Sequence, residues 1–118
     1  MIVAGFGCRS EAGEQSLRAA LHAHGETATA LATLTHKEAQ LAPLAKALRL
    51  PLILVDPSAL AGIHTPTQSP ASLATYGTGS VAEAVALLAA GPGAELVATR
   101  RISPDGQATC ALARGVSA

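Results

Sequence analysis

The residues best suited to chemistry lie near the start of the chain, in the segment "AGFGCRSEAG" at residues 4–13. Two glycines flank Phe6, and Cys8, Arg9 and Ser10 follow directly. A glycine-rich turn before a helix presents backbone N–H groups that bind anions. A thiol beside a helix start is a candidate nucleophile, because the helix field lowers its pKa. The same letters also describe an ordinary strand-to-helix corner capped by Ser10.

The nucleotide-binding interpretation of this segment lacks its defining residues. A dinucleotide fingerprint requires G-x-G-x-x-G, and Ser10 stands where the third glycine should be. No acidic residue follows the next expected strand, which finishes at Leu34 and Thr35. The lysine of a Walker loop is also missing. A nucleotide-binding regulatory α/β module therefore remains only as one alternative.

A cysteine nucleophile would need a base and a group that orients it. His36 follows an expected strand and His64 lies in an expected loop, so these two histidines are the candidate bases for Cys8. Glu83 is a further candidate acid or base. Together Cys8, His64 and Glu83 define the hydrolase alternative. The competing interpretation of Cys8 is a small, half-buried side chain.

No metal site is expected from the spacing of histidines and cysteines. His22 and His24 are two residues apart, so they point to different sides of the helix expected there. Neither Cys8 nor Cys110 has a neighbour at zinc-ligand spacing.

A second helix start follows in "TGSVAEA", where Ser80 and Glu83 have the spacing of a capping box. Two glycine-flanked helix starts near one edge of a sheet would together suit a polyanionic ligand. Arg9, Lys37, Arg100 and Arg101 are dispersed along the sequence. They are either solvated surface charges or a ring of cations around a carboxylate-rich ligand.

Composition narrows the class of protein. The 118 residues carry zero formal net charge and are 49% hydrophobic, with Phe6 and Tyr76 as the two aromatic residues. The electrostatic footprint and stacking surface of a nucleic-acid-binding protein are therefore missing. No apolar stretch reaches the ~20 residues of a membrane span, and "MIVAGFG" does not read as a signal peptide. A cytoplasmic protein with reduced Cys8 and Cys110 is expected.

Alternating strand and helix patterns predict one α/β domain over residues 1–118. Strands are expected at residues 1–6, 28–34, 50–55, 95–102 and 108–114. Helices are expected from Ser10 toward Gly25, from a Thr35 cap to Leu48, after Asp56, and between Ser80 and Gly91, with a long loop at 62–75. The predicted fold is a three-layer α/β/α sandwich with a mainly parallel, five-stranded mixed sheet and a C-terminal antiparallel hairpin. The first three strands should be parallel neighbours, with the hairpin on the other side of the first strand.

Four segments in order resemble one family. They are "GFGCRS", "LATLTHKEAQLAPLAKALRLPL", "TYGTGSVAEAVALLAAG" and "ATCALARG". Together they resemble the CobE family, which is equivalent to the C-terminal domain of CbiG in cobalamin biosynthesis. The resemblance implies the stand-alone CobE form, associated with the aerobic route, and a role around contraction of the corrin ring. CbiG-type proteins open a lactone on a cobalt-precorrin and release acetaldehyde, which is the hydrolytic alternative.

The resemblance implies a partner that is a tetrapyrrole-derived small molecule, a precorrin or corrin acid, together with other enzymes of the cobalamin pathway. No cofactor, nucleic acid or membrane partner is expected. The chain is expected to bind a carboxylate-rich intermediate as a carrier or assisting factor. The expected ligand-binding residues are Gly5, Gly7, Cys8, Arg9, Ser10, Lys37, His64, Thr65, Gly77, Thr78, Gly79 and Ser80.

Overall fold

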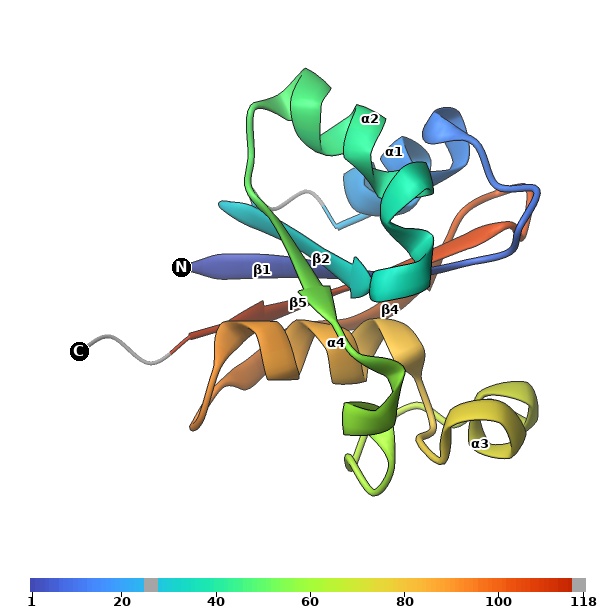
Figure 1. The fold of residues 1–118 in the computed structure, drawn as a ribbon, viewed down its shortest axis with the longest axis vertical. Helices are drawn as coiled ribbons and strands as arrows, with labels where there is room; N and C mark the ends of the chain where they lie inside the picture. Colours follow the sequence, from blue (N-terminus) through green and yellow to red (C-terminus); the bar gives the residue numbers. More distant parts are fainter. Residues whose placement is uncertain (25–27, 116–118) are drawn as a thin grey trace.

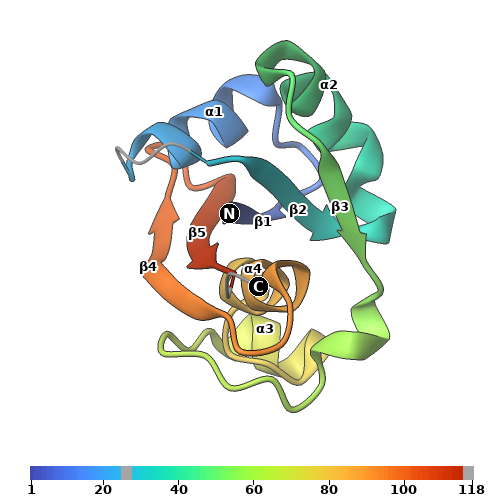
Figure 2. The same ribbon diagram turned by 90° about the vertical axis from the view of Figure 1, so that its left-hand side faces the viewer.

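The computed structural model describes residues 1–24 and 28–115 and arranges them in three layers (Figures 1 and 2). The strands are β1 (Ile2–Cys8), β2 (Ala30–Leu34), β3 (Leu52–Val55), β4 (Glu95–Ile102) and β5 (Ala108–Arg114). The α-helices are α1 (Glu14–His22), α2 (Glu38–Leu48), α3 (Pro70–Tyr76) and α4 (Val81–Ala90). Helices α1 and α2 cover one face of the sheet and α4 covers the other, as Figure 2 shows. The predicted three-layer α/β/α fold is confirmed.

Strand β1 lies in the middle of the sheet, whose order is β3-β2-β1-β5-β4. It pairs in parallel with β2 and antiparallel with β5. The predicted neighbours, with the hairpin β4–β5 beyond β1, are therefore confirmed. The carboxyl end of β1 is where parallel and antiparallel neighbours meet, and ligands in open α/β sheets bind beyond such ends.

Each face of the sheet has its own apolar core. Phe6, Leu17 and Leu44 are fully buried on the α1–α2 side, and Val3 and Val85 are fully buried on the α4 side. The α4 side is packed so closely that a Cβ on Gly5 would lie 2.4 Å from the Ala82 carbonyl oxygen. The absence of a side chain at Gly5 is therefore what allows α4 to lie against β1.

The first helix begins later than predicted. Gly13, rather than Ser10, occupies the N-cap position of α1, and no side chain caps it. Residues 9–12 form a turn instead, in which the Ala12 N–H donates to the Arg9 carbonyl at 3.0 Å. The Gln40 side-chain amide, which donates to the Arg9 and Ala12 carbonyls, holds this turn from α2. Gln40 is about 30 residues away in the sequence, so the residues around Ser10 alone do not indicate these hydrogen bonds.

Two further predictions about element ends are wrong. Thr35 does not cap α2, because it opens a 3-10 turn, η1 (Thr35–Lys37), that leads into the helix. The predicted loop at 62–75 contains α3, which Ser69 caps by accepting a hydrogen bond from the Ser72 N–H. None of the side chains of α3 is buried, so the apolar periodicity that signals a helix is missing.

Other predicted ends agree with the structure. Asp56 caps a short 3-10 helix, η2 (Pro57–Leu60), by accepting from the Ser58 N–H. Helix α4 runs from Val81, after the Ser80 cap, to Ala90, and Gly91 is its C-cap. Gly25, the predicted end of the first helix, lies outside the described residues.

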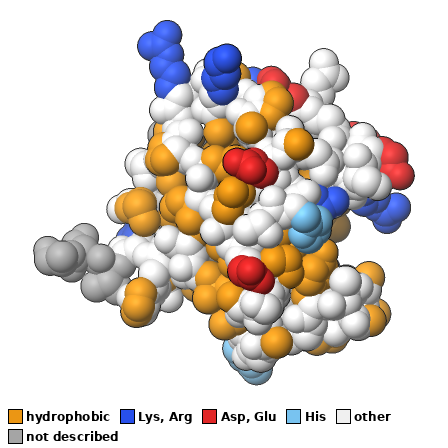
Figure 3. Space-filling view, in the orientation of Figure 1, with side chains coloured by type: hydrophobic (Ala, Val, Ile, Leu, Met, Phe, Trp, Pro, Cys, Tyr) orange, Lys and Arg blue, Asp and Glu red, His pale blue; other side chains and the backbone are white. Residues whose placement is uncertain are grey.

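The described part of the chain holds no single helix long and apolar enough to cross a membrane. By length and composition alone, α3 and α4 would pass such a test as a pair, bent by 56° at their break. On the face drawn in Figure 3, basic and acidic side chains are scattered and do not form one patch of a single sign.

Candidate functional site

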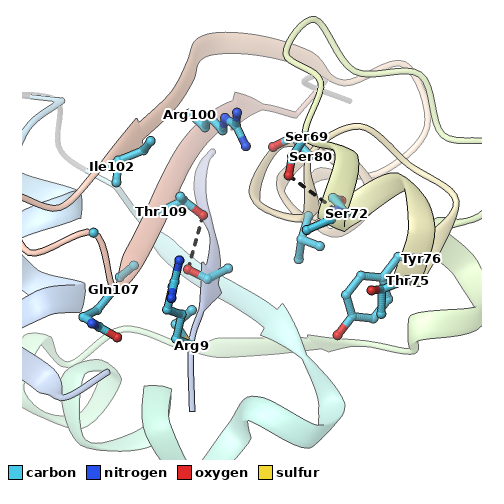
Figure 4. Close-up of a pocket in the computed structure, with 16 residues that line it drawn as sticks. Arg9, Ser69, Ser72, Thr75, Tyr76, Ser80, Arg100, Ile102, Gln107 and Thr109 are labelled. Atoms are coloured by element: carbon cyan, nitrogen blue, oxygen red, sulfur yellow. Dashed lines mark hydrogen bonds between the residues drawn. The ribbon is translucent and has the colours of Figure 1, made fainter. Parts of the chain in front are cut away.

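A cleft of about 520 Å³ opens at the carboxyl end of β1. One wall is the β4–β5 hairpin, and the opposite wall is α3 together with the first residues of α4 (Figure 4). Gly7, Cys8 and Arg9 line it at the end of β1. A cavity of this size lies within the ~300–1,000 Å³ range of small-molecule sites.

Among the described residues, the cleft is lined by the cations Arg9 and Arg100 and by no acidic side chain. Arg9 and Arg100 lie at opposite ends of it in Figure 4. The ion pair found among the described residues joins Arg18 to Glu14, and neither of these two residues lines the cleft. Neither cleft arginine therefore has a carboxylate partner in the described part of the chain. Two unpaired guanidinium groups in one cleft suit a ligand with several carboxylates.

A third cation adjoins the cleft. Lys37, at the end of η1, lines a small cavity of about 60 Å³ that also contacts Cys8 and Tyr76. Tyr76 stacks on His36 with ring centroids 6.5 Å apart, and its hydroxyl lies 3.4 Å from His36 Nε2. The Tyr76 ring is therefore held at the boundary between the two spaces.

The lining combines hydroxyl groups with apolar surface. Ser72 Oγ donates to the Thr78 carbonyl, and Thr109 Oγ1 donates to the Gly7 carbonyl at 3.2 Å. Ile102 is 56% exposed and lines the cleft together with Val81. A flat, partly apolar ligand with polar groups at its rim would match these walls.

The start of α4 faces the cleft, as expected for the second helix start. Ser80 and Val81 both line it. Ser80 Oγ accepts a hydrogen bond from the Glu83 N–H at 3.2 Å, which satisfies one of the first-turn donors. The Val81 and Ala82 N–H groups have no acceptor in the described part of the chain. The positive end of this helix therefore adds to the field of the arginines.

The start of α1, expected to form the other wall, does not line the cleft. In its first turn, Ser16 Oγ donates a hydrogen bond to Asp105 Oδ2, so a carboxylate of the protein itself lies at this helix start. Asp105 also accepts from Ser103 Oγ at 2.5 Å and from the Gln107 N–H at 3.0 Å. These hydrogen bonds, led by that from Ser103, hold the pKa of Asp105 below its ordinary value. The helix start is therefore used to hold the turn of the β4–β5 hairpin.

Cys8 does not have the activated thiol that a helix start would give it. The helix begins six positions further on, at Glu14. Burial raises the pKa of Cys8 above its ordinary value of 9.0, and the Lys37 ammonium opposes this rise. The expected lowering of the Cys8 pKa is therefore wrong.

We predict slow alkylation of Cys8 by iodoacetamide at pH 7.5. Because the Cys8 pKa is raised, its thiolate fraction at that pH is smaller than that of an ordinary cysteine, and its rate should still increase above pH 9. Mass spectrometry of the labelled protein measures this rate, with the peptide GFGCRS as the unfolded reference. A rate that levels off below pH 8 would contradict the structure.

The two other candidate catalytic residues lie apart from Cys8. Glu83 is fully buried and accepts hydrogen bonds from the Thr67 and Arg100 N–H groups. It does not reach back to the Ser80 N–H, so the predicted capping box is only half formed. His64 lines a separate cavity of about 170 Å³. The structure does not bring Cys8, His64 and Glu83 together as one catalytic set.

The expected ligand-binding residues divide among several surroundings. Gly7, Cys8, Arg9 and Ser80 line the cleft, and Lys37 lies in the cavity that adjoins it. Gly5 is covered by α4, and Ser10 lies exposed outside the cleft lining. The remaining expected residues line the separate 170 Å³ cavity; they are His64, Thr65, Gly77, Thr78 and Gly79.

Sequence reasoning also missed several residues of the cleft. Those with polar side chains are Ser69, Ser72, Thr75, Tyr76, Arg100, Gln107 and Thr109. Arg100 was one of four dispersed cations, and nothing in the local sequence distinguishes it from Arg101. The "SPAS" segment carries a signal that was available, namely a serine cap followed by proline at the first helical position. Within the described residues, no three His, Cys, Asp or Glu side chains are placed to hold a metal ion.

Comparisons with known proteins agree on one family. The model of the family described as "Cobalamin synthesis G C-terminus" matches residues 2–113. A crystal structure of CobE, a protein from the cobalamin (vitamin B12) biosynthetic pathway, is 32% identical with a TM-score of 0.81, over 100% of this chain and 92% of that one. Cobalamin biosynthesis protein chiG from Agrobacterium tumefaciens is 37% identical with a TM-score of 0.73, over 99% and 100% of the two chains.

A more distant neighbour shares the fold. The putative cobalamin biosynthesis protein G homolog from Sulfolobus solfataricus is 19% identical with a TM-score of 0.72. The match covers 95% of this chain and 36% of that longer one. A search among curated proteins found no match to this chain.

Proposed function

The chain belongs to the cobalamin synthesis G C-terminal family of cobalamin biosynthesis proteins, and on that premise we propose that its cleft binds a carboxylate-rich precorrin or corrin intermediate. The protein would act as a carrier or assisting factor around the stage of ring contraction. The observation that carries this proposal is that Arg9 and Arg100 lie at opposite ends of the cleft. In the described part of the chain, neither forms an ion pair with a carboxylate, and no acidic residue lines the cleft.

The chemistry of such a ligand matches the walls. A corrin-type macrocycle is a flat apolar ring with carboxylates around its edge. Ile102 and Val81 offer apolar surface for the ring, while Arg9, Arg100 and the start of α4 offer cations and N–H donors for the edge. Lys37 lies close enough to the cleft lining to add a third positive charge.

A binding role has more support in this structure than a hydrolytic one. Cys8 has a raised pKa, both oxygens of Glu83 accept backbone N–H groups, and His64 lines another cavity. Binding needs only the charge and shape of the cleft. For this reason we do not extend the lactone-opening reaction to this chain.

Titration of the purified protein with a corrin acid tests the proposal. We expect a saturable change in the ligand's visible absorbance, with one ligand bound per chain. Affinity should fall as salt is added, because exposed charge pairs are screened over about 8–10 Å at physiological ionic strength. No spectral change with ligand in the high micromolar range would overturn the proposal. The neutral amide form of the same ring serves as the matched ligand control.

A further inference from the structure

We propose that Glu83 is a positioning residue that sets the spacing between the two walls of the cleft and aims Arg100 into it; this inference rests on the proposed function. Glu83 lies in the first turn of α4 and is fully buried. It does not line the cleft, so it would act only through the residues that it holds.

The carboxylate of Glu83 joins two segments that are far apart in the sequence. Its Oε1 accepts from the Thr67 N–H at 3.1 Å, in the segment that leads into α3. Its Oε2 accepts from the Arg100 N–H at 2.8 Å, in β4. One wall of the cleft is α3 and the other includes β4, so a single side chain is bonded to β4 and to the segment that leads into α3.

The bond to Arg100 falls at an irregularity in the sheet. Ala98 pairs with Leu112 and Arg101 pairs with Cys110, so β4 has one residue more than β5 between these pairs. Such a bulge changes the direction of the side chains around it and leaves a backbone group outside the ladder. Glu83 supplies the acceptor that this ladder does not, and the Arg100 side chain lines the cleft.

The bond to Thr67 holds the opposite wall, which has little packing of its own. Helix α3 buries none of its side chains. Its other links include the bond from the Ser69 N–H to the Gly79 carbonyl at 2.7 Å and the bond from Ser72 Oγ to the Thr78 carbonyl. A buried carboxylate without a counter-ion costs stability unless it is hydrogen-bonded. The two backbone N–H groups that bond to Glu83 offset the free-energy cost of burying its carboxylate, and they belong to the segments that position the two walls.

Glu83→Gln tests the assignment with little change of shape. The amide keeps one acceptor oxygen and puts a donor where the second oxygen was, so one of the two N–H groups loses its partner. We expect the variant to remain folded and to bind the corrin acid about tenfold more weakly. A loss of this size is typical when a hydrogen bond that orients a binding residue is removed, as measured at metal sites. Glu95→Gln, an exposed carboxylate on the same strand as Arg100, is the control and should bind as wild type does.

A double-mutant cycle separates positioning from a merely structural role. If Glu83 acts by aiming Arg100, Glu83→Gln should weaken binding by less than twofold once Arg100→Gln is present. Equal losses in both backgrounds would overturn the claim that Glu83 aims Arg100. So would unchanged affinity of a folded Glu83→Gln protein.

Hydrogen exchange measured by NMR provides a readout that needs no ligand. In the wild type, the Thr67 and Arg100 amides should exchange slowly, and at least one should exchange faster in Glu83→Gln. Unprotected amides in the wild type would overturn the assignment, even where the variant fails to fold. Failure of the wild type to bind a corrin acid would instead refute the proposed function.

Discussion

Glutamine at both Arg9 and Arg100 is expected to lower the affinity for a corrin acid by about 100-fold or more. Each guanidinium group would form a charge-assisted hydrogen bond with a ligand carboxylate, and such bonds contribute about 1.5–3 kcal/mol each. Arg9 is exposed, so solvent screening places its share at the lower end. Isothermal titration calorimetry of the two single variants and the double variant measures the loss.

The matched control for this experiment is Arg101→Gln. Arg101 is adjacent to Arg100 on β4, is exposed and does not line the cleft. The same loss of charge at Arg101 should leave affinity within about twofold of wild type, since it removes only a screened, long-range attraction. An equal effect of Arg101→Gln and Arg100→Gln would show that net charge, rather than the cleft, controls binding.

Gly5→Ala is expected to destabilise the fold by about 3 kcal/mol, the upper part of the usual range for overpacking. The added Cβ would lie 2.4 Å from the Ala82 carbonyl oxygen and 2.5 Å from the Ala86 backbone nitrogen. Both contacts are with backbone, so no side-chain rotation relieves them, and α4 must move off β1. Since α4 carries Ser80 and Val81 into the cleft, ligand binding should weaken as well.

Urea unfolding followed by circular dichroism measures this change in free energy. Gly13→Ala is the control, because a Cβ at Gly13 would meet no atom within 4 Å. That variant should lose at most about 1 kcal/mol, the typical cost of a poorer helix cap. A Gly5→Ala protein as stable as Gly13→Ala would contradict the close packing of α4 on β1.

The sheet was predictable because its signals are local or follow general rules. The apolar runs of β1 and β2 are buried on both faces, as an interior parallel strand requires. Asp105-Gly106 is a typical hairpin turn sequence, and it lies between the two strand patterns at 95–102 and 108–114. Since β1 has a parallel neighbour on one side and an antiparallel neighbour on the other, ligands are expected beyond its carboxyl end, and the cleft lies there.

The wall formed by α3 was not predicted, because Ser69 and Pro70 at its start are its one sequence signal and no apolar periodicity follows them. Its sequence is not periodic, because its side chains face solvent or the cleft instead of a core. The role of Glu83 was also hidden. Its spacing from Ser80 indicated a capping box, whereas the structure shows that its carboxylate bonds to segments 16 and 17 residues away. Contacts over such distances depend on the folded chain.

The division of the expected ligand residues has a similar cause. Gly77, Thr78 and Gly79 directly precede Ser80 in the sequence, so one wall seemed to include all four. The structure turns these three residues toward the 170 Å³ cavity and leaves Ser80 in the cleft. Thr78 is held on that side by its hydroxyl, which donates to the Ile63 carbonyl at 2.7 Å.

The most direct test of the cleft as the binding site is a map of backbone amide shifts in an NMR titration with a corrin acid. Binding in the cleft predicts the largest changes at Gly7, Arg9, Val81, Arg100 and Thr109, which line its walls. The residues around His64 in the other cavity should shift little. Changes centred on His64, or no changes at saturating ligand, would contradict the account.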